Sequence, residues 1–327
     1  MKITNLYPES QQLEVEVIEF LKEWNNDETY VLAQTSGSTG TPKTIRLEKG
    51  KMIASAKMTG EFFDLKNCQT ALLVLSPKFI AGKMMVVRSL IFDLELYIGR
   101  LKTQAISTEL PVQIDFAAMI PTQVKELLST SVSFDNIKHL IIGGSPMDND
   151  LLDKLSLVST SCYATFGMTE TISHFALAKV GEGDLRYKTL PGITINLDSK
   201  SRLEVEAPAL VDDKLSTNDI VELFGENEFV WKGRFDHVIN SGGIKIFPEL
   251  VEQKLSSFID CPFFIAGETD DKFGERVVLY IESKELVSID FDALDKYEIP
   301  KKTYNRTSFV WTDSGKINRL KTIERSV

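Results

Sequence analysis

A loop rich in hydroxyl groups and glycine carries the strongest chemical signal in the sequence. Residues 35–43 read TSGSTGTPK, so Ser and Thr hydroxyls, two glycines and Lys43 lie close together. Glycine lets backbone N–H groups turn toward a ligand, hydroxyl groups add hydrogen-bond donors, and the lysine adds a positive charge. Together these groups suit a polyphosphate, although a flexible surface turn can have a similar composition.

Two other catalytic loops do not match this segment. A P-loop needs the pattern GxxxxGK followed by Ser or Thr, and Gly37, Gly40 and Lys43 have a different spacing. A nucleophile elbow needs GxSxG, which this loop lacks, so Ser38 is a poor candidate for a hydrolase nucleophile. The segment is therefore better interpreted as a phosphate-binding loop of another type.

The loop resembles the phosphate-binding signature of the superfamily that contains acyl-CoA synthetases, peptide-synthetase adenylation domains and luciferases. Further motifs of that superfamily follow in the same order along the chain. They are an aromatic-Gly-x-Thr-Glu motif at FGMTE (166–170), a strand aspartate at TND (217–219) and a GR-x-D hinge at KGRFD (232–236). A glycine loop at SGGIKIFPE (241–249) and a lysine motif at SGKINR (314–319) follow. The resemblance therefore extends from residue 35 to residue 319, and an ordered set of this kind is specific.

The resemblance implies a site for Mg²⁺ and ATP. Glu170 would bind Mg²⁺, Phe166 would stack on the adenine, and Thr169 would contact the α-phosphate. Asp219 would accept hydrogen bonds from the ribose hydroxyls, and Arg234 would contact the ribose or the phosphates. The other positions implied for nucleotide binding are Thr35, Ser36, Gly37, Ser38, Thr39, Gly40, Thr41, Lys43, Gly143, Gly144, Ser145, Thr165, Gly167, Met168, Ser241, Gly242 and Gly243. Core packing for Phe166, a surface ion pair for Arg234 and a simple turn at Ser145 stay open as alternatives.

Lys316 is the residue that the resemblance assigns to the first chemical step. A lysine that touches both the attacking carboxylate and the bridging oxygen of ATP offsets the repulsion between two anions and stabilises the transition state. Asp236 would be the hinge between a large domain at residues 1–235 and a small mobile domain at 236–327. The implied reaction forms an acyl-adenylate, which the thiol of coenzyme A then attacks.

Two further segments indicate which carboxylic acid is the substrate. The segment 77–85 (PKFIAGKMM) and FGMTETISH resemble short bacterial 2-succinylbenzoate–CoA ligases of menaquinone biosynthesis. That substrate carries two carboxylates, so its pocket needs a cation, and Lys83 is the candidate, with a solvated lysine as the alternative. His174 is interpreted as a wall residue of the acyl pocket, with a core histidine as the alternative. Other aryl- or acyl-CoA synthetases, enzymes that load a carrier protein, and non-catalytic nucleotide binders stay open.

Alternating strand and helix patterns indicate the elements that position these residues. Apolar runs at 71–76, 115–120, 139–142 and 162–166 each end near Pro or Gly, and helical patterns follow several of them. This order predicts α/β layers with a mixed sheet, and ligands lie at the carboxyl ends of parallel strands. Alternating runs at 202–206, 219–224 and 228–232 predict antiparallel strands. A small α+β domain with a helix that starts at Pro248 follows.

Composition limits the partners and the compartment. The net charge of −10 disfavours binding to nucleic acid or anionic membranes. Cys68, Cys162 and Cys261 are odd in number and far apart, which favours a reducing cytoplasm. No run is apolar enough to span a bilayer, so no membrane insertion is expected. The expected partners are a small carboxylic acid, ATP and coenzyme A, and the protein is expected to be a monomer or homodimer.

Overall fold

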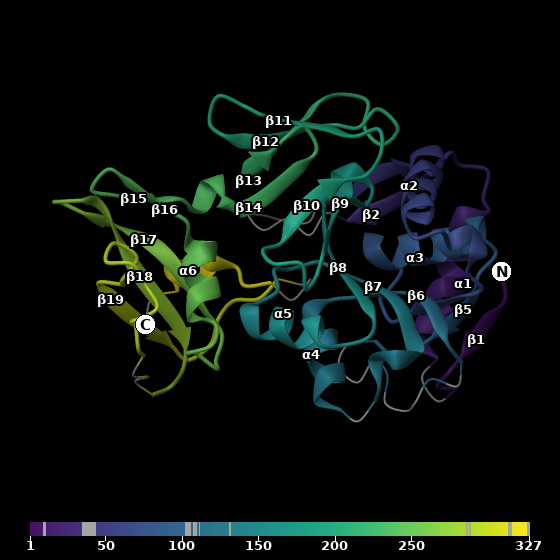
Figure 1. Cartoon of the computed structure of the whole chain (residues 1–327), viewed down its shortest axis with the longest axis horizontal. Coiled ribbons are helices and arrows are strands. Elements are labelled where there is room, and N and C mark those ends of the chain that lie inside the picture. The colour runs from purple at the N-terminus through teal and green to yellow at the C-terminus, as the bar shows by residue number, and fades with distance from the viewer. Residues whose placement is uncertain are drawn as a thin grey trace.

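Two larger sheets and one hairpin organise the chain (Figure 1). The computed structural model describes residues 1–8, 11–34, 44–101, 106, 110, 112–130, 132–285, 287, 289–312 and 316–325. The helices are α1 (Gln12–Trp24), α2 (Lys49–Phe62), α3 (Ile80–Ile91), α4 (Pro121–Ser129), α5 (Asn149–Ser156), α6 (Pro248–Leu255) and α7 (Arg319–Glu324).

The strands divide among three sheets. The large sheet contains β1 (Ile3–Asn5), β4 (Thr70–Leu73), β5 (Glu95–Ile98), β6 (Ile114–Met119), β7 (Ile137–Ile142), β8 (Ser161–Gly167), β9 (His174–Lys179), β10 (Arg186–Thr189), β11 (Thr194–Leu197), β12 (Arg202–Glu206), β13 (Leu215–Phe224) and β14 (Glu228–Arg234). The small sheet contains β15 (Ile239–Ser241), β16 (Ile244–Ile246), β17 (Phe263–Asp270), β18 (Gly274–Glu282) and β19 (Lys302–Arg306). The hairpin is β2 (Tyr30–Gln34) paired with β3 (Thr44–Glu48).

The large sheet has a parallel half and an antiparallel half. Its order is β1-β5-β4-β6-β7-β8-β9-β10-β14-β13-β12-β11, and the first six strands are parallel. From β8 to β11 every neighbouring pair is antiparallel. The carboxyl ends of β6, β7 and β8 therefore open at one edge of the sheet, where ligands of α/β proteins lie.

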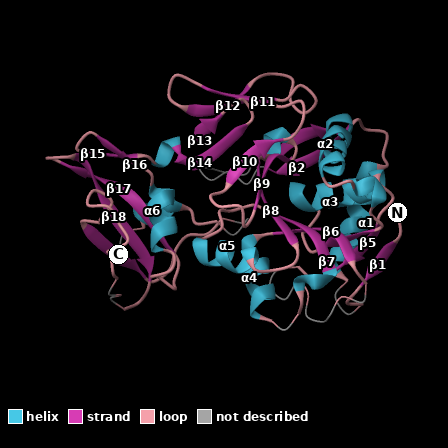
Figure 2. Cartoon of the chain, in the orientation of Figure 1, coloured by secondary structure: helices cyan, strands magenta, loops and turns pink. Residues whose placement is uncertain are grey.

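Alternating apolar residues bury both faces of the parallel half. Leu73 and Ala118 belong to one core with side chains of α1, α2 and α3, whereas their neighbours Leu72 and Ala117 belong to a second core with α4 and α5. Successive side chains of a strand point to opposite faces, so apolar runs rather than strict alternation are needed here. Figure 2 shows helices α1 to α5 beside this half of the sheet.

Local signals start the helices that follow the strands. Pro121 and Pro248 are the first residues of α4 and α6, a position where the missing N–H costs nothing. Asp148 caps α5, and its Oδ1 accepts a hydrogen bond from the backbone N–H of Leu151 at 2.9 Å. These contacts fix where each loop at the sheet edge ends.

The predicted α/β fold with a mixed sheet and the antiparallel strands after it are confirmed, and the details differ in element bounds and in the strands that sequence patterns did not reveal. Strand β13 begins at Leu215, not Asp219, because pairing with β12 extends it through a polar stretch. Helix α3 begins at Ile80, three residues before Lys83, where the sequence pattern predicts a helical stretch that runs to Phe92. The strands that were not predicted are β1, β2, β3, β5, β9, β10, β11, β15, β16 and β19. Of these, β15 and β16 flank the glycine loop and form a hairpin.

The chain passes from the large sheet to the small sheet within a few residues. Strand β14 ends at Arg234, a short 3₁₀ turn spans Phe235–His237, and β15 begins at Ile239. The division at 235/236 stays a prediction. Among the described helices, none is long and apolar enough to cross a membrane.

Candidate active site

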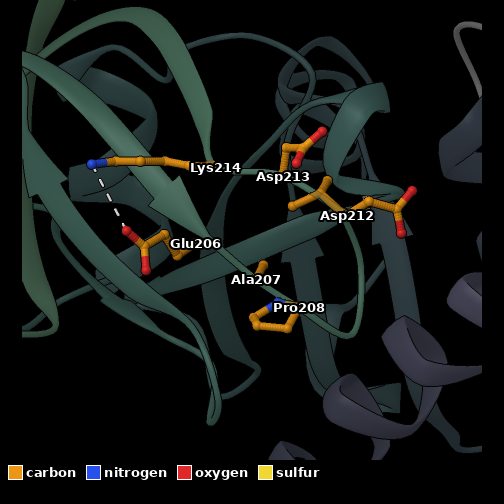
Figure 3. Close-up of a pocket in the computed structure, with 7 residues that line it drawn as sticks. Glu206, Ala207, Pro208, Asp212, Asp213 and Lys214 are labelled. Atoms are coloured by element: carbon orange, nitrogen blue, oxygen red, sulfur yellow. Dashed lines mark ion pairs between the residues drawn. The ribbon is translucent and has the colours of Figure 1, made fainter.

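One open pocket lies away from every predicted site residue. It has a volume of about 310 Å³ and follows the β12–β13 connection, where Glu206, Asp212 and Asp213 give it an acidic lining (Figure 3). Lys214 in its wall already pairs with Glu206 and Glu204. An acidic surface repels phosphates, so the nucleotide site must be sought elsewhere.

The sheet edge after β7 has room only for glycine. A Cβ on Gly143 would lie 2.0 Å from Oγ1 of Thr165, whose hydroxyl donates to the backbone oxygen of Ile142 at 3.2 Å. Gly144 has a φ of +93°, a region that favours glycine. Gly144 and Ser145 are exposed, so this loop can border a ligand at the carboxyl end of the sheet.

The segment after β8 presents one buried and one exposed polar side chain. Thr169 is 9% exposed and begins a 3₁₀ turn, whereas the carboxylate of Glu170 reaches solvent. Phe166 is half-buried and packs edge-on against the rings of Phe175, Tyr187 and Phe229. The core-packing alternative for Phe166 is therefore real, and adenine stacking by its remaining surface stays a prediction. Gly167 and Met168 lie between Phe166 and the turn.

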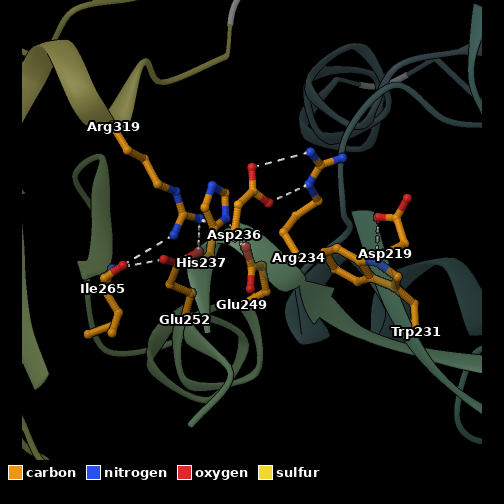
Figure 4. A network of polar contacts seen from close by, with 9 residues as sticks. All are labelled: Asp219, Trp231, Arg234, Asp236, His237, Glu249, Glu252, Ile265 and Arg319. Atoms are coloured by element: carbon orange, nitrogen blue, oxygen red, sulfur yellow. Dashed lines mark hydrogen bonds and ion pairs between the residues drawn. The ribbon is translucent and has the colours of Figure 1, made fainter. Parts of the chain in front are cut away.

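A buried carboxylate stands across the edge of the antiparallel half. Asp219 is 7% exposed and lies directly opposite Arg234 in the β13–β14 pairing. Its Oδ1 accepts a hydrogen bond from Nε1 of Trp231 at 3.0 Å (Figure 4). Burial raises the pKa of Asp219, while the Arg234 charge and the Trp231 bond act in the opposite direction. The Trp231 bond holds this carboxylate in one orientation, and its two oxygens can accept further hydrogen bonds.

The predicted hinge residue is tied to the same arginine. Nε of Arg234 donates to Oδ1 of Asp236 at 3.2 Å, directly after the last strand of the large sheet. Burial opposes ionisation of Asp236, but the hydrogen bond and charge of Arg234 outweigh it and lower the pKa. If the backbone rotates at Asp236, the ion pair with Arg234 must either break or move with the chain.

Lys316 comes from the far end of the chain to the same place. It lies in a short hairpin in which its backbone N–H donates to Oγ1 of Thr312 at 3.0 Å, and Trp311 pairs with Ile317. The residue is exposed, yet surrounding protein atoms first, and the charge of Arg234 next, lower its pKa, while Asp219 acts in the opposite direction. The charges of Arg234 and Asp219 therefore act on the ammonium group of Lys316.

The glycine loop is the tight turn of the β15–β16 hairpin. Ser241 pairs with Ile244, so Gly242 and Gly243 form a two-residue turn with φ values of +59° and +84°. Both central positions of such a turn need positive φ, which explains two consecutive glycines. The turn is exposed and can approach a ligand with its backbone.

Strands β2 and β3 flank the phosphate-binding motif. Residues 35–43, including every hydroxyl residue of TSGSTGTPK and Lys43, lie outside the described residues. The flanking strands β2 and β3 pair in register from Tyr30 with Glu48 to Gln34 with Thr44. The assignment of this loop to phosphate binding stays a prediction.

The two predicted acid-pocket residues have protein partners. Nζ of Lys83 donates to Oε2 of Glu23 at 2.8 Å and lies 4.4 Å from the centre of the Phe20 ring, so a protein carboxylate already neutralises it. His174 is buried, and its Nε2 lies 3.2 Å from Oγ1 of Thr59. The core-histidine alternative fits this environment, and a pocket-wall role for His174 stays a prediction.

Sequence reasoning missed Arg88, a buried cation beside His174. Arg88 is 2% exposed on α3, and its Nη2 donates to Oγ of Ser173 at 2.8 Å. Within the described part of the chain its Nε has no hydrogen-bond partner and no carboxylate pairs with it. Burial lowers its pKa to about 9. The available signal was an arginine inside the apolar stretch MMVVRSLI, where a charge needs a reason.

Comparison with known proteins agrees with this geometry. A family model described as AMP-binding enzyme matches residues 4–203. The 2-succinylbenzoate–CoA ligase of Staphylococcus epidermidis is 25% identical, with 88% of this chain and 68% of that protein covered. The 2-succinylbenzoate–CoA ligase of Listeria monocytogenes is 26% identical, with 98% and 75% covered.

Solved structures give the same result. An acyl-CoA synthetase (AMP-forming)/AMP-acid ligase II-like protein from Dyadobacter fermentans is 32% identical with a TM-score of 0.65, covering 96% of this chain and 94% of that one. The o-succinylbenzoate CoA synthetase of Bacillus subtilis, in complex with its acyl-adenylate, shares the fold with a TM-score of 0.80 at 22% identity, covering 90% and 69%.

The fold and the family match define an adenylate-forming enzyme. The chain belongs to the AMP-binding enzyme family, and within it to the AMP-forming acid–CoA ligases.

Proposed function

We propose that this enzyme converts 2-succinylbenzoate, ATP and coenzyme A into the acyl-CoA thioester, AMP and pyrophosphate, a step of menaquinone biosynthesis. The reaction class follows from the family. The names of the Staphylococcus and Listeria relatives support this acid. The free thiols of Cys68, Cys162 and Cys261 are compatible with the cytoplasm as its location.

Lys316 is the proposed catalytic residue of the first step. A carboxylate oxygen of the acid attacks the α-phosphorus of ATP, and pyrophosphate leaves with the electron pair of the broken P–O bond. The ammonium group stabilises the negative charge that builds on the bridging oxygen. The charges of Asp219 and Arg234, which flank the proposed ribose site, act on the ammonium group of Lys316, and this supports the role.

The nucleotide lies along the edge formed by β7, β8 and β13 in this proposal. Asp219 accepts from the ribose hydroxyls, Thr169 contacts the α-phosphate, and residues 35–43 hold the outer phosphates. Glu170 fits Mg²⁺, because its carboxylate is exposed at the sheet edge. Mg²⁺ usually keeps several waters and takes one or two carboxylates plus substrate phosphates. When bound, the ion would neutralise phosphate charge.

The second step needs no protein nucleophile. The sulfur of coenzyme A attacks the acyl carbon of the mixed anhydride, its proton is lost to solvent, and AMP leaves with the electrons of the C–O bond. We propose that rotation about Asp236 withdraws Lys316 and brings the turn at Gly242 and Gly243 to the thioester path. The short connection between Arg234 and Ile239 supports a hinge there.

Arg88 is the single observation that carries the choice of acid. Among the described residues no carboxylate pairs with the buried Arg88 guanidinium. An unpaired buried charge is strongly destabilising, so a ligand that supplies the carboxylate explains its presence. Ser173 and His174 lie directly beside it, and His174 pairs with Gly167 of the FGMTE segment. Burial and the Arg88 charge lower the pKa of His174 well below its ordinary value, so His174 is neutral. A substrate with a second carboxylate fits this environment.

The test compares two acids that differ by one carboxylate. Pyrophosphate and thioester formation are measured with 2-succinylbenzoate and with 4-oxo-4-phenylbutanoate, which lacks the ring carboxylate. In Arg88→Met, loss of a charged hydrogen bond should raise KM for 2-succinylbenzoate by roughly 10- to 100-fold and leave the analogue nearly unchanged. Equal effects on both acids would reject Arg88 as the second carboxylate's partner. Lys83→Ala tests the competing residue, and its pairing with Glu23 predicts an unchanged KM.

The same assay separates the remaining alternatives. AMP release that depends on a carrier protein and ignores free coenzyme A would indicate carrier loading. Absence of pyrophosphate with every acid, at saturating Mg·ATP, would reject the catalytic assignment as a whole.

A further inference from the structure

We propose that Arg319 is the positioning residue that presents Lys316 to the reacting atoms. Arg319 touches none of the proposed substrates. It acts by fixing the lysine-bearing segment to α6 and β17, so this inference rests on the proposed role of Lys316. Three sets of contacts support it.

The first set is a closed ring of hydrogen bonds at the start of α7. Nη1 of Arg319 donates to the backbone oxygen of Ile265 at 3.1 Å, and Nη2 donates to Oε2 of Glu252 at 2.8 Å. The other carboxylate oxygen of Glu252 accepts from the backbone N–H of Ile265 at 2.8 Å. Each of the three groups therefore contacts the other two (Figure 4). The planar guanidinium makes such a forked contact, which a lysine cannot reproduce.

The second set joins Arg319 rigidly to Lys316. Only Ile317 and Asn318 separate them, and both are held by the backbone: Ile317 pairs with Trp311, and Asn318 donates from its N–H to the oxygen of Val310 at 2.7 Å. The side chain of Asn318 caps α7 by accepting from the N–H of Lys321 at 3.1 Å. A displacement of Arg319 is therefore transmitted to Lys316.

The third set links this anchor to the hinge. Nη2 of Arg319 also lies 3.8 Å from Oε1 of Glu249, one turn before Glu252 on α6. The same oxygen of Glu249 contacts Nδ1 of His237 at 2.5 Å, directly after Asp236. Arg319 thus offsets the repulsion between the carboxylates of Glu249 and Glu252, and Glu249 in turn contacts His237 beside the hinge. The segment that carries Lys316 is fixed relative to the point about which the small domain would turn.

The test uses the two half-reactions, because only the first one needs Lys316. In Arg319→Met, kcat for pyrophosphate formation should fall on the order of a hundred-fold, since a misplacement of about 1 Å can have that effect. Thioester formation from supplied acyl-adenylate and coenzyme A should stay within a few-fold, because it uses the glycine turn and not Lys316. Arg319→Lys keeps the charge without the fork and should give an intermediate rate.

A matched control lies on α6, the helix whose Glu252 binds Arg319. Lys254 of α6 pairs with Asp295 and Glu298 at 3.1 and 2.7 Å, away from the lysine-bearing segment. Lys254→Met also removes ion pairs of the small domain, and it should leave both half-reactions within a few-fold. Thermal unfolding of all variants shows how much each loses in stability.

The outcomes separate this inference from the proposed function. A selective loss of adenylation in Arg319→Met with partial recovery in Arg319→Lys supports a positioning role. Equal losses of both half-reactions, or no loss of adenylation, overturn it. If Lys316→Ala loses adenylation while Arg319→Met does not, the positioning role fails and the function stands. If the unaltered enzyme forms no pyrophosphate, the proposed function fails first.

Discussion

The indole nitrogen of Trp231 lies 3.0 Å from Oδ1 of Asp219 and donates a hydrogen bond to it across neighbouring strands. A neutral donor thereby holds a buried carboxylate. Burial raises the pKa of this carboxylate, and the hydrogen bond from Trp231 acts in the opposite direction. The bond leaves the net charge of the site unchanged while it fixes the direction of the oxygens. Asp219 can accept from the indole and from a ribose hydroxyl at the same time, since a carboxylate has two acceptor oxygens.

Replacing the donor alone should weaken nucleotide binding. Trp231→Phe keeps an aromatic ring but removes the N–H, and a hydrogen bond to a charged group contributes about 1.5–3 kcal/mol. We expect KM for ATP to rise roughly tenfold and the pKa of Asp219 to rise further, so the defect grows as the pH is lowered. The measurement is initial pyrophosphate release against ATP concentration between pH 5.5 and 8. Trp24→Phe, at a half-buried tryptophan of α1, is the matched substitution control and should leave KM for ATP unchanged. An ATP dependence equal to that of the unaltered enzyme would contradict the assignment of Asp219.

Removing the catalytic ammonium group should separate the two steps. Lys316→Ala should reduce the rate of adenylate formation on the order of a hundred-fold or more, as loss of one transition-state contact typically does. KM for ATP should change little, because Asp219 and Arg234 remain. Single-turnover formation of the acyl-adenylate measures the first step, and thioester formation from supplied adenylate measures the second. Comparable losses in both steps would point to unfolding of the small domain.

The motifs predicted the site to the extent that it depends on local backbone. FGMTE and the glycines at 143 and 144 follow parallel strands, and the structure puts both at the same sheet edge, because carboxyl ends of adjacent parallel strands must meet. The two consecutive glycines likewise indicate the two-residue turn at Gly242 and Gly243, because both positions have positive φ. Strand β19 gave no such signal, because the residues KTYNR become a strand only when β18 lies beside them.

The sequence motifs did not predict which charged side chains pair with each other. Lys83 and Arg88 are both cations of one apolar helix, and sequence alone favoured Lys83 for the acid. The structure gives Lys83 a partner in Glu23 and gives Arg88 none among the described carboxylates. Such pairing depends on helices that are distant in sequence, which periodicity does not reveal. The phosphate loop at 35–43 had the clearest motif of all and lies outside the described residues.

The Glu252 carboxylate should make folding stability depend on pH near neutrality. Burial, opposed by Arg319 and reinforced by Glu249, raises its pKa from 4.5 to about 7. The folded state then binds a proton more readily than the unfolded state, so stability is lost as pH rises from about 4.5 to 7. A shift of this size corresponds to at most about 3 kcal/mol, and water reduces it because 19% of the side chain is exposed.

The amide variant removes this titration. The stability of Glu252→Gln relative to the unaltered protein should increase between pH 5 and pH 8, as measured by thermal or urea unfolding. Glu249→Gln is the control of opposite sign: burial opposes its ionisation, but His237 and Arg319 lower its pKa. Its charge therefore stabilises the fold above the unfolded pKa, and stability is lost as pH falls. Parallel pH profiles for the two variants would contradict both assignments.

Gly233 should be essential for the contact between the hinge and α6. Its φ is +149°, and a Cβ there would lie 2.5 Å from Oε2 of Glu249, a buried oxygen with no partner among the described residues. Gly233→Ala should cost roughly 1–3 kcal/mol through backbone strain and crowding, and it should slow adenylation by displacing α6. Glu249→Ala removes the obstructing carboxylate, so the double variant should be less impaired than the sum of the single ones. Unfolding free energies and adenylation rates of all four proteins measure this coupling. Strict additivity would mean that backbone strain alone, and not contact with Glu249, requires glycine next to Arg234.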